Sequence, residues 1–272
     1  MSGSTQGKLR RLVQADVQAA LQLSMQAGWN QTADDWSMLL QLAPHSCLAI
    51  EMENELAATT TLLSYGMRLA WIGMVLTKKE FHGRGFARRL LSEALKLADQ
   101  MKIETVKLDA TEQGKPLYEK SGFRSEQPVE RWSLNRIGCD VHSPNVASTT
   151  WNDSDPEAFG ADRSSLLNCL AERNPPWSVP KAFLLGREGV NTAYLGPCVS
   201  DSPQTARMLI ERFMQMNKSS VSWDVLSQNG EAVAIAKDLG FAPQRHLTRM
   251  VRGKDLRAKE NSVYALAGFE FG

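Results

Sequence analysis

One arrangement of elements occurs twice in this chain of 272 residues. In each half an apolar segment of strand length leads through a loop into an amphipathic helix, and a short helix ending in Gly-Phe follows. Such a repeat indicates two copies of one fold, one after the other. The matched segments are WIGMVL at 71–76 with YLGPCV at 194–199, ARRLL at 87–91 with ARMLI at 206–210, and KSGF at 120–123 with DLGF at 238–241.

The spacing of apolar residues predicts the class of the fold. Alternation and β-branched runs predict strands, and recurrence every three or four residues predicts helices. The first half then has the order β-α-α-β-β-β-α-β-α-β. This order favours an α+β fold, in which a mostly antiparallel twisted sheet is flanked by helices. The first half has expected strands at 9–13, 47–52, 56–63, 69–76, 105–110 and 131–137, and expected helices at 17–27, 33–42, 87–101 and 116–120. In the second half we expect strands at 181–185 and 192–195, and helices from about 164 and over 203–216.

Composition along the chain predicts the domain boundaries. Residues 1–8 are polar and are expected to be a flexible leader, and residues 9–137 form the first domain. Residues 138–150 are rich in Ser, Asn, Asp and Pro and predict a linker, although Val146 and Ala147 allow a strand there. Residues 151–272 form the second copy.

The loop between the expected strand 69–76 and its helix has the sequence HGRGF, residues 82–86. Glycines allow the backbone to approach a ligand, and the first N–H groups of a helix have no partner within it. With cations such as Arg84 and Arg88 nearby, the loop predicts a cradle for a pyrophosphate. The second copy has DSPQT at 201–205 instead, which lacks glycine and carries an acid. It also has Ala236 where the first copy has Tyr118, so we expect it to have kept the fold and lost the chemistry.

Bulk properties limit the other possibilities. The chain is 43% hydrophobic and 22% charged with a formal net charge of +1, so no overall field attracts it to nucleic acid or to a membrane. The four cysteines form no CxxC pair and the histidines have no ligand spacing, so we expect no metal. No apolar run has the length of a membrane span. The polar N-terminal segment and the unpaired cysteines favour a cytoplasmic location.

Two motifs together resemble the GNAT superfamily of acyl-CoA-dependent N-acyltransferases. The superfamily signature is Gln or Arg, two residues, Gly, one residue, then Gly or Ala; here it reads His82 to Ala87, with His at the first position. The segment LYEKSGF, Leu117 to Phe123, is the second motif. The resemblance covers roughly residues 9–136. The whole chain resembles a bacterial subgroup of tandem GNAT proteins with a degenerate C-terminal copy.

The resemblance implies acetyl-CoA as co-substrate and Tyr118 as the general acid for the leaving thiolate. Pantetheine is expected to pair with the backbone of Val75, Leu76 and Thr77. The superfamily often has a CoA-binding Asn seven residues before the Tyr; here that position is Thr111, whereas the second copy has Asn229 at the equivalent place. The residues expected to hold the pyrophosphate are His82, Gly83, Arg84, Gly85, Phe86, Ala87 and Arg88.

The acceptor is expected to be an amine of a small molecule or of a protein. Candidate residues for its pocket are Trp29, Asn30, Asp34 and Trp36, and Asp109 is a candidate base. Equally, the tryptophans fit a hydrophobic core and Asp109 fits a solvated or capping carboxylate. A non-catalytic acyl-CoA-binding regulatory module is the alternative function, and a nucleic-acid-binding protein is a third. The chain is expected to be a monomer or a homodimer.

Overall fold

The structure, a computed structural model, describes residues 7–135, 152–217, 219–256 and 258–272. It divides into two compact units, residues 1–107 and 108–272, which are described one at a time. The expected linker at 138–150, including Val146 and Ala147, lies outside the described residues. Within them, every helix is too short or too polar to cross a membrane.

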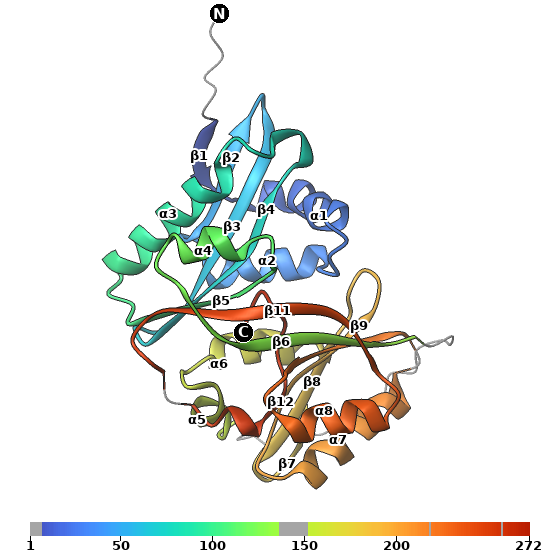
Figure 1. Ribbon diagram of the computed structural model, residues 1–272. Coiled ribbons are helices and arrows are strands. Elements are labelled where there is room, and N and C mark those ends of the chain that lie inside the picture. Colours follow the sequence, from blue (N-terminus) through green and yellow to red (C-terminus); the bar gives the residue numbers. More distant parts are fainter. Residues whose placement is uncertain (1–6, 136–151, 218, 257) are drawn as a thin grey trace, which may run out of the picture. The chain divides into compact units, whose positions relative to one another are not determined.

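Unit 1 is built on a sheet with the strand order β1-β2-β3-β4-β5 (Figure 1). Neighbours run antiparallel except β4 and β5, which are parallel. The β2–β3 hairpin turns at Glu53 and Asn54, which both have positive φ, as expected for a tight turn. The strands are β1 (Lys8–Arg11), β2 (Cys47–Met52), β3 (Glu55–Tyr65), β4 (Leu69–Thr77) and β5 (Thr105–Ala110).

Helices cover both faces of this sheet. Helix α3 (Phe86–Gln100) lies on one side, and α1 (Val17–Gln26) and α2 (Ala33–Leu42) lie on the other (Figure 1). Strand β3 is accordingly buried over most of its length. Helix α2 begins where predicted, because Thr32 forms a capping box: its hydroxyl accepts from the Asp35 N–H at 3.1 Å, and its own N–H donates to the Asp35 carboxylate at 2.9 Å.

Unit 2 contains a sheet with the order β11-β6-β10-β9-β8-β7, and β12 pairs with β9. Strand β8 is buried at every residue, since α6 and α7 both pack on it. Its helices are α4 (Lys115–Glu119), α5 (Asp155–Phe159), α6 (Ser164–Arg173), α7 (Pro203–Met216) and α8 (Gly230–Asp238). Its strands are β6 (Arg124–Leu134), β7 (Trp177–Val179), β8 (Ala182–Arg187), β9 (Ala193–Ser200), β10 (Val221–Leu226), β11 (Ala242–Gly253) and β12 (Val263–Ala265).

Strand β6 differs from the expectation in length. The strand begins at Arg124, whereas the prediction began at 131. The prediction missed the first residues, RSEQP, because they are polar and show no apolar alternation. It is held by neighbours on both sides, pairing antiparallel with β11 and with β10. A segment that the sequence analysis assigns to the first domain therefore lies inside the sheet of unit 2, while the domain boundaries at 137 and 151 stay predictions.

The repeat is reproduced in backbone hydrogen bonds. Helix α4 ends with the Phe123 N–H donating to the Tyr118 carbonyl at 3.1 Å, and α8 ends with the Phe241 N–H donating to the Ala236 carbonyl at 3.0 Å. The helices begin alike too: the side chain of Thr111 accepts from the amide of residue 114, and that of Asn229 accepts from the amide of residue 232. Tyr118 and Ala236 thus occupy equivalent positions.

The glycines that end these two helices give a matched test. Gly122 has φ 86° and Gly240 has φ 84°, in the left-handed region where a Cβ is unfavourable. An added Cβ would meet nothing within 4 Å at Gly122 and only Leu134 at 3.8 Å at Gly240, so backbone strain alone sets the cost. We expect Gly122→Ala and Gly240→Ala each to lower the free energy of unfolding by about 1–2 kcal/mol. Urea denaturation measures it, and equal stability of variant and parent would contradict the assigned cap.

Candidate active site

The predicted cradle connects β4 to α3 in unit 1. After β4 a short 3-10 helix, η2 (Lys79–Phe81), leads into the glycine loop. Gly83 and Gly85 have φ 76° and 79°, and an added Cβ would meet no atom within 4 Å at either. The glycines are therefore needed for the left-handed turn rather than for space inside the protein. Gly85 is the N-cap of α3, and no side chain caps this helix. The first amides of a fifteen-residue helix are thus available to an anion.

The cations of the loop have different partners. The guanidinium of Arg84 lies over the ring of Phe81, 5.2 Å from its centre, and the residue is exposed. The ammonium of Lys78 pairs with Glu55 at 2.5 Å, and Arg89 donates to the carbonyl of Gly7 at 2.9 Å. Arg84 and Arg88 are exposed, so these two are the cations of the loop that fit an incoming phosphate best.

His82 contacts the end of β4. Its Nε2 lies 2.8 Å from the carbonyl oxygen of Thr77. Because a carbonyl oxygen only accepts, Nε2 carries the proton and Nδ1 faces elsewhere. The ring therefore ties the loop to the strand, and its role toward a phosphate, which the resemblance implies, stays a prediction.

Strand β4 pairs with β3 along one edge, and along the other edge it pairs with β5 over only part of its length. Leu76 and Thr77 face Thr59 and Ala58 of β3. Toward β5 the parallel register covers Leu69–Trp71 with Thr105–Lys107 and ends there. Between these regions β4 carries a bulge at Met74, whose φ is 51°, and the hydroxyl of Thr59 donates to the Met74 carbonyl at 2.7 Å. The expected pantetheine-binding residues Val75, Leu76 and Thr77 lie beyond this bulge.

Tyr118 lies on α4, in unit 2. Pro116 in the first turn favours this short helix, and the Tyr118 ring packs edge-on against Phe123 with centres 6.1 Å apart. The side chain is 8% exposed, and this burial raises the pKa of Tyr118 to about 12. The hydroxyl is consequently protonated at neutral pH and is available as a donor.

The candidate acceptor residues fall into different environments. Trp36 is 1% exposed and its indole N–H donates to the Ser24 hydroxyl at 3.2 Å, as a satisfied core tryptophan does. Asn30 is buried, and Trp29 is half-buried in the connection between α1 and α2. Asp34 lies in the first turn of α2. The structure thus gives Trp36 a packing role, and Trp29 and Asn30 stay the predicted acceptor residues.

Asp109 is neither solvated nor a cap. Its side chain is fully buried, and both carboxylate oxygens accept from Arg249, at 2.9 and 3.0 Å. Arg249 comes from β11, 140 residues away in sequence, which is why no local pattern indicated the pair. Both oxygens of this carboxylate are therefore turned toward Arg249 rather than toward a substrate. The geometry therefore favours a structural ion pair, and the base role of Asp109 stays an untested prediction.

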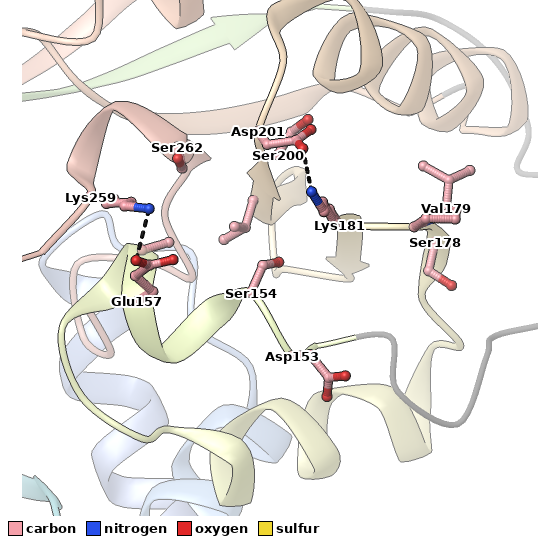
Figure 2. A pocket seen from close by; sticks show the side chains of 13 residues that line it. Asp153, Ser154, Glu157, Ser178, Val179, Lys181, Ser200, Asp201, Lys259 and Ser262 are labelled. Atoms are coloured by element: carbon pink, nitrogen blue, oxygen red, sulfur yellow. Dashed lines mark ion pairs between the residues drawn. The ribbon is translucent and has the colours of Figure 1, made fainter.

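The equivalent loop of the second copy has opposite electrostatics. Ser202 caps α7 by accepting from the Thr205 N–H at 3.1 Å, so this helix end is already occupied. Beside it lies a pocket of about 690 Å³ whose lining includes three carboxylates and two ammonium groups (Figure 2). Lys259 pairs with Glu157 at 2.7 Å and Lys181 lies 3.9 Å from Asp201. Such a surface does not favour a pyrophosphate.

Both halves of the chain match known acetyltransferase sequence models. The sequence model of the acetyltransferase (GNAT) family matches residues 15–123, and a second model, an acetyltransferase (GNAT) domain, matches residues 153–265. The uncharacterized N-acetyltransferase YitH of Bacillus subtilis is 24% identical over 281 residues, covering 97% of this chain and 98% of that protein.

Solved structures share the fold over almost the whole chain. A putative acetyltransferase from Pyrococcus horikoshii has a TM-score of 0.86 at 22% identity, covering 98% of this chain and 96% of that one. A GCN5-related N-acetyltransferase from Sphaerobacter thermophilus has a TM-score of 0.65 at 15% identity, covering 94% and 100%. These structures share the fold, and the two family matches, which together cover most of the chain, show that it belongs to the acetyltransferase (GNAT) family and carries two GNAT domains in tandem.

Proposed function

We propose that the first copy transfers an acetyl group from acetyl-CoA to a primary amine by direct attack in a ternary complex. The observation that carries this proposal is the uncapped N-terminus of α3, entered through two left-handed glycines directly after β4. This arrangement lies within the segment that matches the GNAT family, together with Tyr118. The second copy has neither the glycines nor the tyrosine.

The chain supplies binding and a hydrogen-bond donor rather than a covalent nucleophile. The amides at the start of α3, with Arg84 and Arg88, hold the pyrophosphate, and the edge of β4 at Val75–Thr77 holds the extended pantetheine. Attack of a neutral amine on the thioester carbon places negative charge on the carbonyl oxygen, which a backbone N–H stabilises. The carbonyl then re-forms as the C–S bond breaks, and the charge moves to sulfur. The nitrogen releases one proton to water, which offsets the charge of the departing thiolate, so the products are an amide and CoA.

Tyr118 acts on that sulfur. A free thiol has a pKa of about 8.5, well below the pKa of about 12 of the buried tyrosine. Tyr118 therefore keeps its proton while negative charge develops on the sulfur, and it stabilises that charge through a donated hydrogen bond. Full proton transfer to the thiolate is uphill at these pKa values. The acid role thus depends on how the bound thioester changes the surroundings of the hydroxyl.

The main alternative is a module that binds acyl-CoA without turnover. Such a module would need the glycine cradle to bind the cofactor, but it would not need Tyr118. Retention of Tyr118, at the position where the second copy has Ala236, favours catalysis. The acceptor is an amine of a small molecule or of a protein, with Trp29 and Asn30 as the residues we propose beside it.

Replacing Tyr118 by Phe tests catalysis. Because only the donated hydrogen bond is removed, we expect kcat to fall about 100-fold and the Kd of acetyl-CoA to stay within about twofold. A thiol-release assay against an amine panel and calorimetry measure the two quantities. Tyr65→Phe, at another buried tyrosine, is the control and should change kcat little. Unchanged turnover in Tyr118→Phe would remove this residue from the mechanism.

Replacing Gly85 by Glu tests the cradle. The carboxylate would stand at the anion site and the side chain would strain the left-handed turn, so we expect CoA binding to weaken at least about 100-fold in calorimetry. Gly66→Glu is a matched control, because Gly66 also has positive φ and open space around it, at the opposite end of β4. Normal CoA affinity of the Gly85 variant would refute the assignment.

A further inference from the structure

The segment after residue 260 lies between two parallel strands of unit 2. Strands β9 and β10 pair directly only at Ala193–Leu195 with Val221–Trp223. Beyond that point β12 pairs antiparallel with β9, with Val263 opposite Val199 and Ala265 opposite Cys198. The Leu266 N–H donates to the Asp224 carbonyl of β10 at 2.9 Å. Residues 261–267, here named the insert, therefore bridge the two strands.

Buried polar side chains hold the insert by its backbone. The indole N–H of Trp223 donates to the Tyr264 carbonyl at 2.8 Å. The amide of Asn229 donates to the carbonyls of Val263 at 2.9 Å and Asn261 at 3.1 Å. Arg187 donates to the carbonyl of Ala267 at 2.5 Å. Proteins bind extended peptides through hydrogen bonds to the main-chain groups of the peptide. Here side-chain donors bind the carbonyls of the insert, and residues 263–267 are all buried.

A glycine on β9 makes room for the insert. A Cβ at Gly196 would stand 2.1 Å from the carbonyl oxygen of Leu266, against main-chain atoms that cannot move aside. Gly196 lies at the bulge of β9, where the register with β8 shifts between Leu184 and Gly186. Its position in the repeat corresponds to Gly73, next to the bulge of β4.

The insert occupies the position that the proposed function gives to pantetheine in the other copy. Val75, Leu76 and Thr77 correspond to Cys198, Val199 and Ser200, and Cys198 and Val199 are the residues that β12 pairs with. Asn229, at the position equivalent to Thr111, binds the insert rather than a cofactor. We propose that the insert acts in the second copy as a built-in substitute for acyl-CoA. The second copy is thus closed to the cofactor, and each chain binds one acyl-CoA.

This inference rests on the proposed function of the first copy, and the test separates the two. Hydrogen exchange is followed at the amides of Ala265 and Leu266, in the parent chain and in Gly85→Glu, with and without saturating CoA. We expect one CoA per parent chain, at least about 100-fold weaker binding to the Gly85→Glu chain, and exchange of the insert changed less than twofold by CoA in both. Binding to Gly85→Glu with at least tenfold faster exchange of the insert would overturn the inference. Absence of CoA binding to the parent would instead refute the proposed function.

A variant of Asn229 tests how the insert is held. Asn229→Asp keeps the oxygen that caps α8 through the Ala232 N–H but loses the donor to Val263 and Asn261. We expect exchange at Ala265 and Leu266 to become at least tenfold faster while the α8 amides keep their protection, which shows that unit 2 is folded. Gly196→Ala is a second variant with the same expectation, through the clash with Leu266. Unchanged exchange of the insert in both variants would contradict its assignment as a bound segment.

Discussion

Both copies depend on a parallel strand pair that is hydrogen-bonded over only three residues. In unit 1 the pairing of β4 with β5 ends at Trp71, and in unit 2 that of β9 with β10 ends at Leu195. Beyond these points β4 and β9 each contain a β-bulge and continue as strands. Backbone N–H and C=O groups on an edge of this kind need partners when they are buried. The second copy supplies them from its own chain, and the first is proposed to take them from pantetheine.

Charge separates the copies as clearly as the backbone does. The loop of the first copy presents uncapped helix amides with Arg84 and Arg88, whereas the second presents Asp201 and a helix already capped by Ser202. In the second copy, Arg187, which donates to Ala267 of the insert, pairs with Glu270, and Arg163, which donates to the carbonyl of Gly272, pairs with Asp155; all four side chains are buried. Buried pairs add less stability than their geometry suggests, because both ions lose hydration, but removal of one partner is costly. Loss of any one of these four side chains would therefore leave a buried charge without its partner in the second copy.

The sequence predicted those parts whose cause is local. The bounds of β5, α2 and α7 and the turn of the glycine loop all follow from periodicity or from a residue's own conformation. Strand β6 and its partner β11 contain polar stretches such as RSEQP and APQRH, whose strand state depends on distant neighbours. The Asp109–Arg249 pair and the packing of Trp36 on Ser24 also needed the folded chain, and both changed the reading of a candidate site residue.

Because Tyr118 and Ala236 occupy equivalent positions, one can ask whether Ala236→Tyr alone would make the second copy active. Ala236 is fully buried in the core of unit 2, so a tyrosine there would meet packed neighbours rather than a thioester. Activity would also need the glycine loop and removal of the insert, whose backbone is bound by Trp223 and Asn229. None of these changes alone supplies both a cradle and an open strand edge. The second copy therefore contributes to the protein as a fixed, self-filled domain, and the proposed chemistry depends on the first copy's cradle and Tyr118.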